Sequence, residues 1–223
     1  MREELKTKAL VLRRTNYSEA DRILNLITPE GKISAYAKGA RKQKSKLAGG
    51  VEMFTLSEMN LHFGKSDMAT VTSARMIKFY SAILKDLNKM ELATEILKKI
   101  SIASESVDTP KHFEIAAMCL EALNDGMDTN VVNAWFLLNL AKAMGEQINL
   151  VTDVNGDDLE AGEYYDWDVN EKAFFKNSNG KYDANVIKVM RIMWGMDLET
   201  TWRIRDLRDY VTKALEIAKL CYN

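Results

Sequence analysis

The chain has 223 residues, of which 47% are hydrophobic and 28% charged, as is ordinary for a folded protein of one or two domains. The formal net charge of −1 by itself says nothing about a polyanionic partner. The charge is unevenly distributed, however, because residues 1–48 hold 12 of the 31 Lys and Arg but only 5 of the 32 Asp and Glu. A balance of +7 there against −8 in the remainder suggests a nucleic-acid-facing N-terminal end.

The first third of the chain is rich in strand patterns. Strands are predicted over residues 6–14, 22–28, 32–37, 52–63 and 67–79. Pro29 and Gly31 have the chemistry of a tight turn between the second and third strands. Five short strands in about 80 residues predict a small barrel, and five is the strand count of an OB-fold, although other small β architectures fit the same pattern.

Beyond residue 80 the apolar residues recur every three or four positions, which is typical of helices. Helices are predicted over residues 87–100, 110–126, 131–144, 183–194 and 207–221. Thr109, Asp128 and Asp183 are expected to cap three of them. We therefore predict an α+β chain with a five-stranded OB-fold barrel at 1–80 and an all-α domain at 81–223. Residues 145–182, rich in Asp, Asn, Glu and Gly, should form an irregular excursion with a small hairpin at 164–175.

The strongest candidate site is the segment KGARKQKSK at 38–46, which has five cations and no acid. Charges this close repel one another by about 1 kcal/mol per close pair even in water, and a polyanion would relieve that repulsion. In the preceding strand Tyr36 shares a face with Lys32 and Lys38, so that the ring could stack on a base, which is worth about 1–3 kcal/mol. The alternative is a solvated loop beside a tyrosine that merely covers the barrel.

Further cations lie near the strand ends. The candidate DNA-binding residues are Arg13, Arg14, Lys32, Tyr36, Lys38, Arg41, Lys42, Lys44 and Lys46. Arg22 is instead expected to pair with Glu19 or Asp21.

Patterns for catalysis and metal binding are missing from the sequence. His62 and His112 are isolated, and the two cysteines, Cys119 and Cys221, lie in apolar helical patterns that predict burial. The segment 153–158 lacks the spacing of a calcium loop, and there is no GxSxG, P-loop or GxGxxG motif. We predict no catalytic residue, no metal and no cofactor. With no signal peptide and no apolar stretch of membrane-spanning length, we expect a cytoplasmic protein.

Three segments together resemble the N-terminal domain of the RecO family of bacterial recombination mediators. They are ALVLRRTNYSEADRIL at 9–24, TPEGKISAYAKGARK at 28–42 and SKLAGG at 45–50, in the family's order and spacing. The resemblance is close over residues 8–50 and weaker to about residue 80. It implies an OB-fold followed by a helical domain, and a protein associated with the nucleoid that binds single- and double-stranded DNA and anneals complementary strands. It also implies action with RecR and the single-strand-binding protein to load RecA, and five loop cations that face DNA.

The sequence departs from that family in one respect. Many RecO proteins carry a four-cysteine zinc site in the C-terminal domain, but the corresponding region here, 145–182, has no cysteine. We expect no such zinc, with hydrogen bonds and aromatic side chains holding the region instead. The aromatic candidates are Tyr164, Tyr165, Trp167, Phe174 and Phe175. The resulting hypothesis is a non-enzymatic DNA-binding and strand-annealing protein. The alternatives are a protein-interaction adaptor and an RNA-binding OB module, each with incidental DNA affinity.

Overall fold

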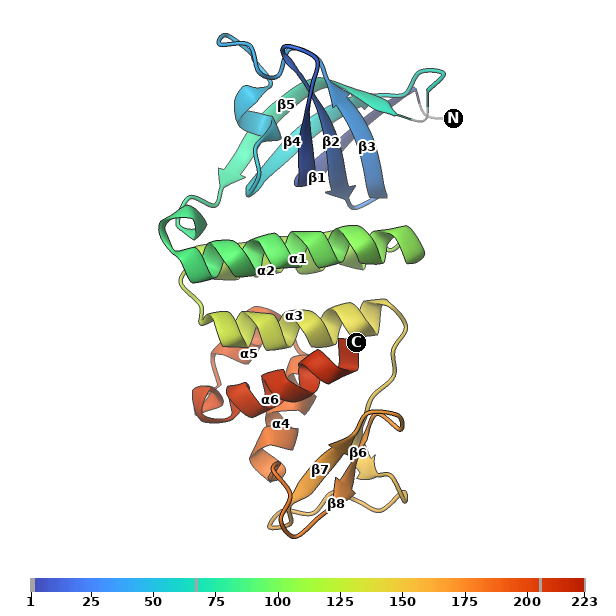
Figure 1. Cartoon of the computed structure of the whole chain (residues 1–223), viewed down its shortest axis with the longest axis vertical. Helices are drawn as coiled ribbons and strands as arrows, with labels where there is room; N and C mark the ends of the chain where they lie inside the picture. Colours follow the sequence, from blue (N-terminus) through green and yellow to red (C-terminus); the bar gives the residue numbers. More distant parts are fainter. Residues whose placement is uncertain (1–2, 67, 205, 223) are drawn as a thin grey trace. The chain divides into compact units, whose positions relative to one another are not determined.

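The chain divides into two compact units in a computed structural model that describes residues 3–66, 68–204 and 206–222 (Figure 1). The first unit is Met1–Asp125 and the second is Gly126–Asn223. Both units combine helices with strands, so the chain is a mixed α+β protein, as predicted.

The first unit begins with five strands that close into a barrel in the order β1-β2-β3-β5-β4. The strands are β1 (Glu4–Tyr17), β2 (Asp21–Thr28), β3 (Gly31–Ala37), β4 (Thr55–His62) and β5 (Ala69–Phe79). All neighbours are antiparallel except β3 and β5, which are parallel. The five predicted strands are therefore confirmed, but the predicted start of the last one, Asp67, lies outside the described residues.

The alternation predicted for β3 places its small apolar residues in the barrel interior. Ala35 and Ala37 are fully buried, whereas Ser34 and Lys38 are exposed. Gly31 closes the turn before β3 with a φ of +109°, a conformation that glycine adopts without strain. A side chain there would also meet Asp108, whose Oδ1 lies 2.3 Å from the position of a Cβ.

Two α-helices complete the first unit, α1 (Leu87–Ser106) and α2 (Lys111–Asn124). There are also two short 3-10 helices: η1 (Ala48–Val51) precedes β4, and η2 (Ile83–Lys85) leads into α1. Helix α1 packs against β1, β3 and α2. Thr109 Oγ1 accepts the N–H of Lys111, but the residue directly before α2 is Pro110, so Thr109 lies one residue outside the predicted cap position. A domain boundary near residue 80 stays a prediction.

The second unit is built around α3 (Thr129–Ala143), which packs against the other three helices of the unit. These are α4 (Ala184–Gly195), α5 (Leu198–Trp202) and α6 (Leu207–Tyr222). Asp128 and Asp183 accept backbone N–H groups at the starts of α3 and α4, so both predicted caps are confirmed. In the described parts of the chain no helix has both the length and the apolar character needed to cross a membrane.

The second unit is mainly helical but it is not all-α, so that expectation was wrong. It contains a three-stranded sheet in the order β6-β8-β7, made of β6 (Asn149–Asp153), β7 (Tyr165–Asp168) and β8 (Ala173–Lys176). The antiparallel pair of β7 and β8 is the predicted hairpin. The parallel pairing of β6 with β8 was missed because it joins two strands that are not consecutive in the chain, with β7 lying between them.

Aromatic side chains form the core of this small sheet. The ring of Phe174 is fully buried and lies edge-to-face against Tyr165, Trp167 and Tyr182, with ring centroids 4.9 to 6.3 Å apart. Tyr182 was not among the predicted aromatics. Tyr164, which was, is 48% exposed and contributes little to the core.

Candidate nucleic-acid interface

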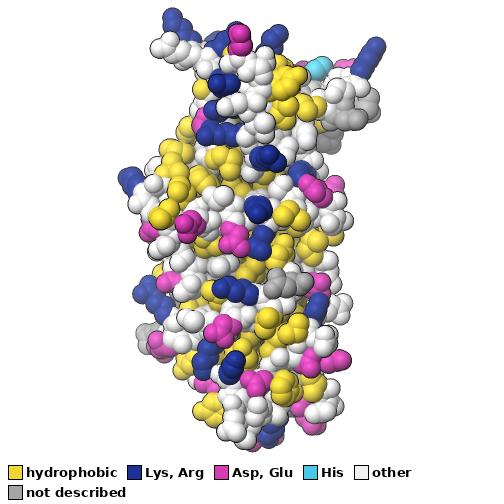
Figure 2. All heavy atoms as spheres, in the orientation of Figure 1, with side chains coloured by type: hydrophobic (Ala, Val, Ile, Leu, Met, Phe, Trp, Pro, Cys, Tyr) yellow, Lys and Arg dark blue, Asp and Glu magenta, His cyan; other side chains and the backbone are white. Residues whose placement is uncertain are grey.

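The basic loop, residues 38–46, leaves the end of β3 and runs into η1 through two successive tight turns. Lys42 N–H donates to Gly39 O at 3.1 Å, and Ser45 N–H donates to Lys42 O at 2.9 Å. The side chains of all five cations are exposed, and none forms an ion pair within the described residues. Figure 2 shows Lys and Arg side chains over the barrel at the top of the view, with few acidic side chains among them. The loop therefore offers its positive charge to an external partner.

Asp21 fixes the root of this loop to the start of β2. Its Oδ1 accepts the Gly39 N–H at 2.6 Å, and its Oδ2 accepts the hydroxyl of Tyr36. The backbone N–H of Arg41 donates to Ala20 O at 2.8 Å beside it. The Tyr36 hydroxyl, and after it the Gly39 amide, hold the pKa of Asp21 below its ordinary value. Asp21 is thus ionised at neutral pH and orders the root of the loop, where the nearby charges of Lys38 and Lys42 also lower its pKa.

An aromatic pair lies beside the loop root. Tyr36, on the outer face of β3, is half-buried, and its ring meets that of Tyr17 edge-to-face at a centroid distance of 6.0 Å. Tyr17 is 52% exposed and was not predicted, because it falls between the predicted strands 6–14 and 22–28 rather than in one of them. A stacking role for Tyr36 stays a prediction, and Tyr17 is the more accessible of the two rings.

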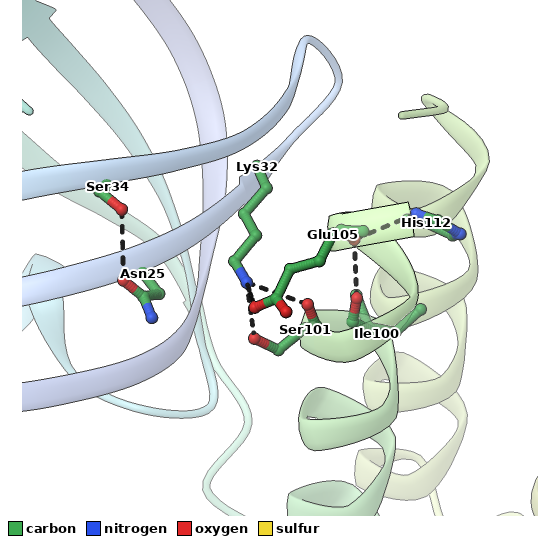
Figure 3. Close-up of polar contacts among 8 residues, drawn as sticks. Asn25, Lys32, Ser34, Ile100, Ser101, Glu105 and His112 are labelled. Atoms are coloured by element: carbon green, nitrogen blue, oxygen red, sulfur yellow. Dashed lines mark hydrogen bonds and ion pairs between the residues drawn. The ribbon is translucent and has the colours of Figure 1, made fainter. Parts of the chain in front are cut away.

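Lys32 lies at the opposite end of β3, about 20 Å along the strand from Lys38 at roughly 3.3 Å per residue. Its ammonium Nζ donates to Ser101 O at 2.9 Å, to Ser101 Oγ at 3.1 Å and to Glu105 at 2.8 Å (Figure 3). These contacts hold β3 against α1, and only 16% of the Lys32 side chain is exposed. The structure therefore does not bring Lys32 together with the basic loop.

Two arginines meet a shared carboxylate at the end of the barrel. Arg22 Nη1 donates to Glu52 Oε1 at 2.7 Å, and Arg14 forms an ion pair with Glu52 Oε2. The expected pairing of Arg22 with Glu19 or Asp21 was wrong, since Asp21 is occupied by Tyr36 and Gly39. Glu52 was missed because it stands 30 residues beyond Arg22 and outside every strand.

The remaining candidate from the sequence, Arg13, is exposed. Five of the nine predicted contacts thus lie on the basic loop, and Tyr36 lies at its root. Arg14 lies in the cluster around Glu52, whereas Lys32 is separated from both groups.

Both cysteines and His112 lie outside this interface and are buried. Burial raises the pKa of the Cys119 thiol and raises that of Cys221 to about 12. Burial lowers the pKa of His112, whose Nδ1 lies 3.0 Å from Ser104 Oγ. Among the residues that the structure describes, no group of three or more His, Cys, Asp or Glu side chains could hold a metal ion. The candidate site is thus an anion-binding surface made of cations, amides and rings.

Two protein-family models together match the whole chain. Residues 1–80 match the family model described as Recombination protein O N terminal, and residues 76–223 match the one described as Recombination protein O C terminal. The protein therefore belongs to the class of recombination proteins. The chain belongs to the RecO family, and its curated relatives are named DNA repair protein RecO. The predicted resemblance is confirmed.

Individual relatives agree with the family match. DNA repair protein RecO of Dehalococcoides mccartyi (strain CBDB1) is 34% identical over 144 residues, which is 64% of this chain and 56% of that protein. DNA repair protein RecO of Listeria monocytogenes serotype 4a (strain HCC23) is 24% identical over 228 residues, which is 95% of this chain and 86% of that protein. The match to the first of these therefore spans little more than half of the relative's length.

Proposed function

We propose that this protein binds single- and double-stranded DNA through the basic loop and the adjoining end of the barrel. We further propose that it anneals complementary strands and acts with RecR and a single-strand-binding protein to help load RecA. The observation that carries the proposal is the set of five exposed, unpaired cations on a loop whose root is fixed by Asp21. Membership of the RecO family supports the same reading.

The barrel fits this function as an OB-fold. Five strands in the order β1-β2-β3-β5-β4 agree with the small Greek-key barrel whose surface and loops bind oligonucleotides. Cations track the backbone phosphates, and each neutralised phosphate releases condensed counterions. Two strands whose charge is neutralised on one protein surface repel each other less, so annealing needs no covalent chemistry.

The test replaces Lys42, Lys44 and Lys46 together by Ala in the full chain. If all five loop cations meet phosphates, the logarithm of the binding constant should fall with the logarithm of salt with a slope of about −3.5 on single strands and about −4.5 on duplex. Removing three cations should reduce these slopes to about −1.4 and −1.8. The variant should keep its melting temperature, because the three side chains are exposed.

The matched control replaces three exposed lysines outside the barrel, Lys85, Lys188 and Lys219, and should leave both slopes unchanged. Fluorescence anisotropy with labelled oligonucleotides gives the slopes, and an annealing assay with and without a single-strand-binding protein gives the activity. Unchanged affinity and slope in the loop variant would refute the proposal. A clear preference for RNA over matched DNA would point instead to an RNA-binding module.

A further inference from the structure

Glu52 holds two arginines at the open end of the barrel, and its carboxylate is shared between them. The side chains of Glu52 and Arg14 are each 37% exposed, while that of Arg22 is only 15% exposed. Glu52 itself follows η1 and precedes β4, so its backbone belongs to no strand. A carboxylate on a connecting segment can leave its partners without disturbing a ladder of backbone hydrogen bonds.

The strand geometry explains why the arginines converge. A register shift between Val11 and Arg13 aligns Arg14 with Leu24, a residue of the barrel interior. Arg22 lies two residues before Leu24 and opposite the buried Ala37, so it continues the same inner face to the end of the barrel. Both guanidiniums therefore stand where the apolar interior ends.

A third guanidinium lies close to this pair. The backbone N–H of Arg41 donates to Ala20 O, two residues from Arg22. Burial lowers the pKa of Arg22, and the nearby charges of Arg14 and Arg41 lower it further. Arg14 and Arg22 thus share the carboxylate of Glu52, and Arg41 adds a third positive charge nearby. Glu91 and Glu95 of α1 line the same pocket as Arg14 and Glu52.

The hydrogen bonding of Arg22 is incomplete with Glu52 as its partner. Its Nε is buried and has no hydrogen-bond partner among the described residues, while Nη1 alone donates to the carboxylate. A guanidinium binds carboxylate or phosphate best through two parallel N–H groups, and a buried N–H without a partner is costly. A backbone phosphate of DNA also presents two charged acceptor oxygens, and it is not tethered to this chain, so it can approach in an orientation in which two N–H groups of Arg22 donate in parallel.

We propose that Arg14, Arg22 and Arg41 form a phosphate-binding site whose resting counter-ion is Glu52, and that a backbone phosphate of bound DNA replaces the carboxylate. This inference rests on the proposed function, since it describes how the same end of the barrel is regulated. Glu52 offsets part of the positive charge of the site in the free protein and competes with the nucleic acid. It therefore weakens the binding of any polyanion that cannot displace it.

The test compares Glu52→Gln with a matched variant, Glu58→Gln. Glu58 also bridges two cations, Lys6 at 3.3 Å and Arg75 at 3.0 Å, and its side chain is similarly exposed at 30%. It lies on the wall of the barrel, on β4, rather than next to the basic loop. Both substitutions remove one negative charge, so the comparison separates the local effect from the change in net charge.

We expect Glu52→Gln to bind single-stranded DNA about two- to fivefold more tightly at low salt, the range that a partly exposed ion pair allows. Because the phosphate meets the arginines in both proteins, the salt slope of Glu52→Gln should stay close to that of the wild type. Glu58→Gln should match the wild type in both measurements. Equal effects of the two substitutions, or a weaker binding by Glu52→Gln, would overturn the inference.

A second variant keeps the inference testable if Glu52→Gln fails to fold. Arg14→Gln should flatten the slope by about 0.7 with an unchanged melting temperature, and an unchanged slope would overturn the inference. The two proposals fail differently. If the triple loop variant loses affinity while Glu52→Gln behaves like Glu58→Gln, the inference is wrong and the proposed function stands. If the triple loop variant keeps its affinity, the proposed function falls and the inference with it.

Discussion

Lys32→Met should destabilise the first unit, because Lys32 joins β3 to α1. The substitution keeps the apolar stem of the side chain but removes three donated contacts, two to Ser101 and one to Glu105. The ion pair contributes little, since 69% of the Glu105 side chain is exposed. Hydrogen bonds donated by a charged group contribute about 1.5–3 kcal/mol, so we expect a loss of roughly that size in the free energy of unfolding.

The control is Lys6→Met, which also removes a lysine from a barrel strand. Lys6 pairs with Glu58, but 66% of its side chain is exposed, so its loss should cost less than about 0.5 kcal/mol. The pH dependence gives a second measure. Lys32 holds the pKa of Glu105 below its ordinary value, so the stabilisation is present near neutral pH and is lost as the pH falls through that lowered pKa. Lys32→Met should lose this part of the acid sensitivity.

The position of the tryptophans allows the unfolding of the two units to be measured separately. All four, Trp135, Trp167, Trp194 and Trp202, lie in the second unit, so their fluorescence follows the unfolding of that unit. Hydrogen exchange of the α1 amides follows the first unit, and there Lys32→Met should exchange faster. An α1 as protected in Lys32→Met as in Lys6→Met would refute the reasoning. A flattened salt slope of DNA binding with unchanged α1 protection would restore Lys32 as a DNA contact.

Two further predictions concern the sheet of the second unit and the root of the basic loop. Phe174→Ala should cost about 3–5 kcal/mol, because it removes a fully buried ring packed against three others. Trp167 fluorescence should report the loss. The control is Phe175→Ala, which removes a half-buried ring. A chelator should leave the melting temperature of the wild type unchanged. Asp21→Ala should free the first turn of the basic loop, so that trypsin cleaves after Lys42 faster at pH 7 than in the wild type. Because the pKa of Asp21 is lowered in the folded protein, its carboxylate keeps the anchoring contacts throughout the pH range in which trypsin is active, so the difference between the two proteins should not depend on pH there. A wild-type cleavage rate in the variant would contradict the anchoring role.

The parts of the fold that could be predicted are those that depend on neighbouring residues. Asp128 and Asp183 cap their helices through N–H groups two and three residues away, so the sequence alone identifies them. The alternation along β3 is equally local: it placed Tyr36 on the face of Lys32 and Lys38, and Ala35 and Ala37 on the other face are buried. Neither prediction needed any knowledge of which strands pair.

The partners of the charged residues could not be predicted, because they come from distant positions. Lys32 meets Ser101 and Glu105, 69 and 73 residues further along the chain, and Arg22 meets Glu52 rather than its neighbours. A strand pattern states which face a side chain occupies but not what lies opposite that face. Lys32 and Tyr36 share a face as predicted, yet one contacts a helix and the other contacts Asp21.

The contacts of Lys32 make the candidate DNA-binding surface smaller than the one that the sequence suggested. A platform running along the outer face of β3 would need Lys32, Tyr36 and Lys38 to act together, but Lys32 is committed to α1 at the far end of the strand. The charge that remains available gathers at one end of the barrel, on the basic loop and around Glu52. There the order of events during binding follows from the contacts. Exposed loop cations can meet a phosphate at once, whereas Arg14 and Arg22 must first give up a carboxylate. A strand should therefore be captured by the loop before it is held at the barrel end, and only the second step should depend on Glu52.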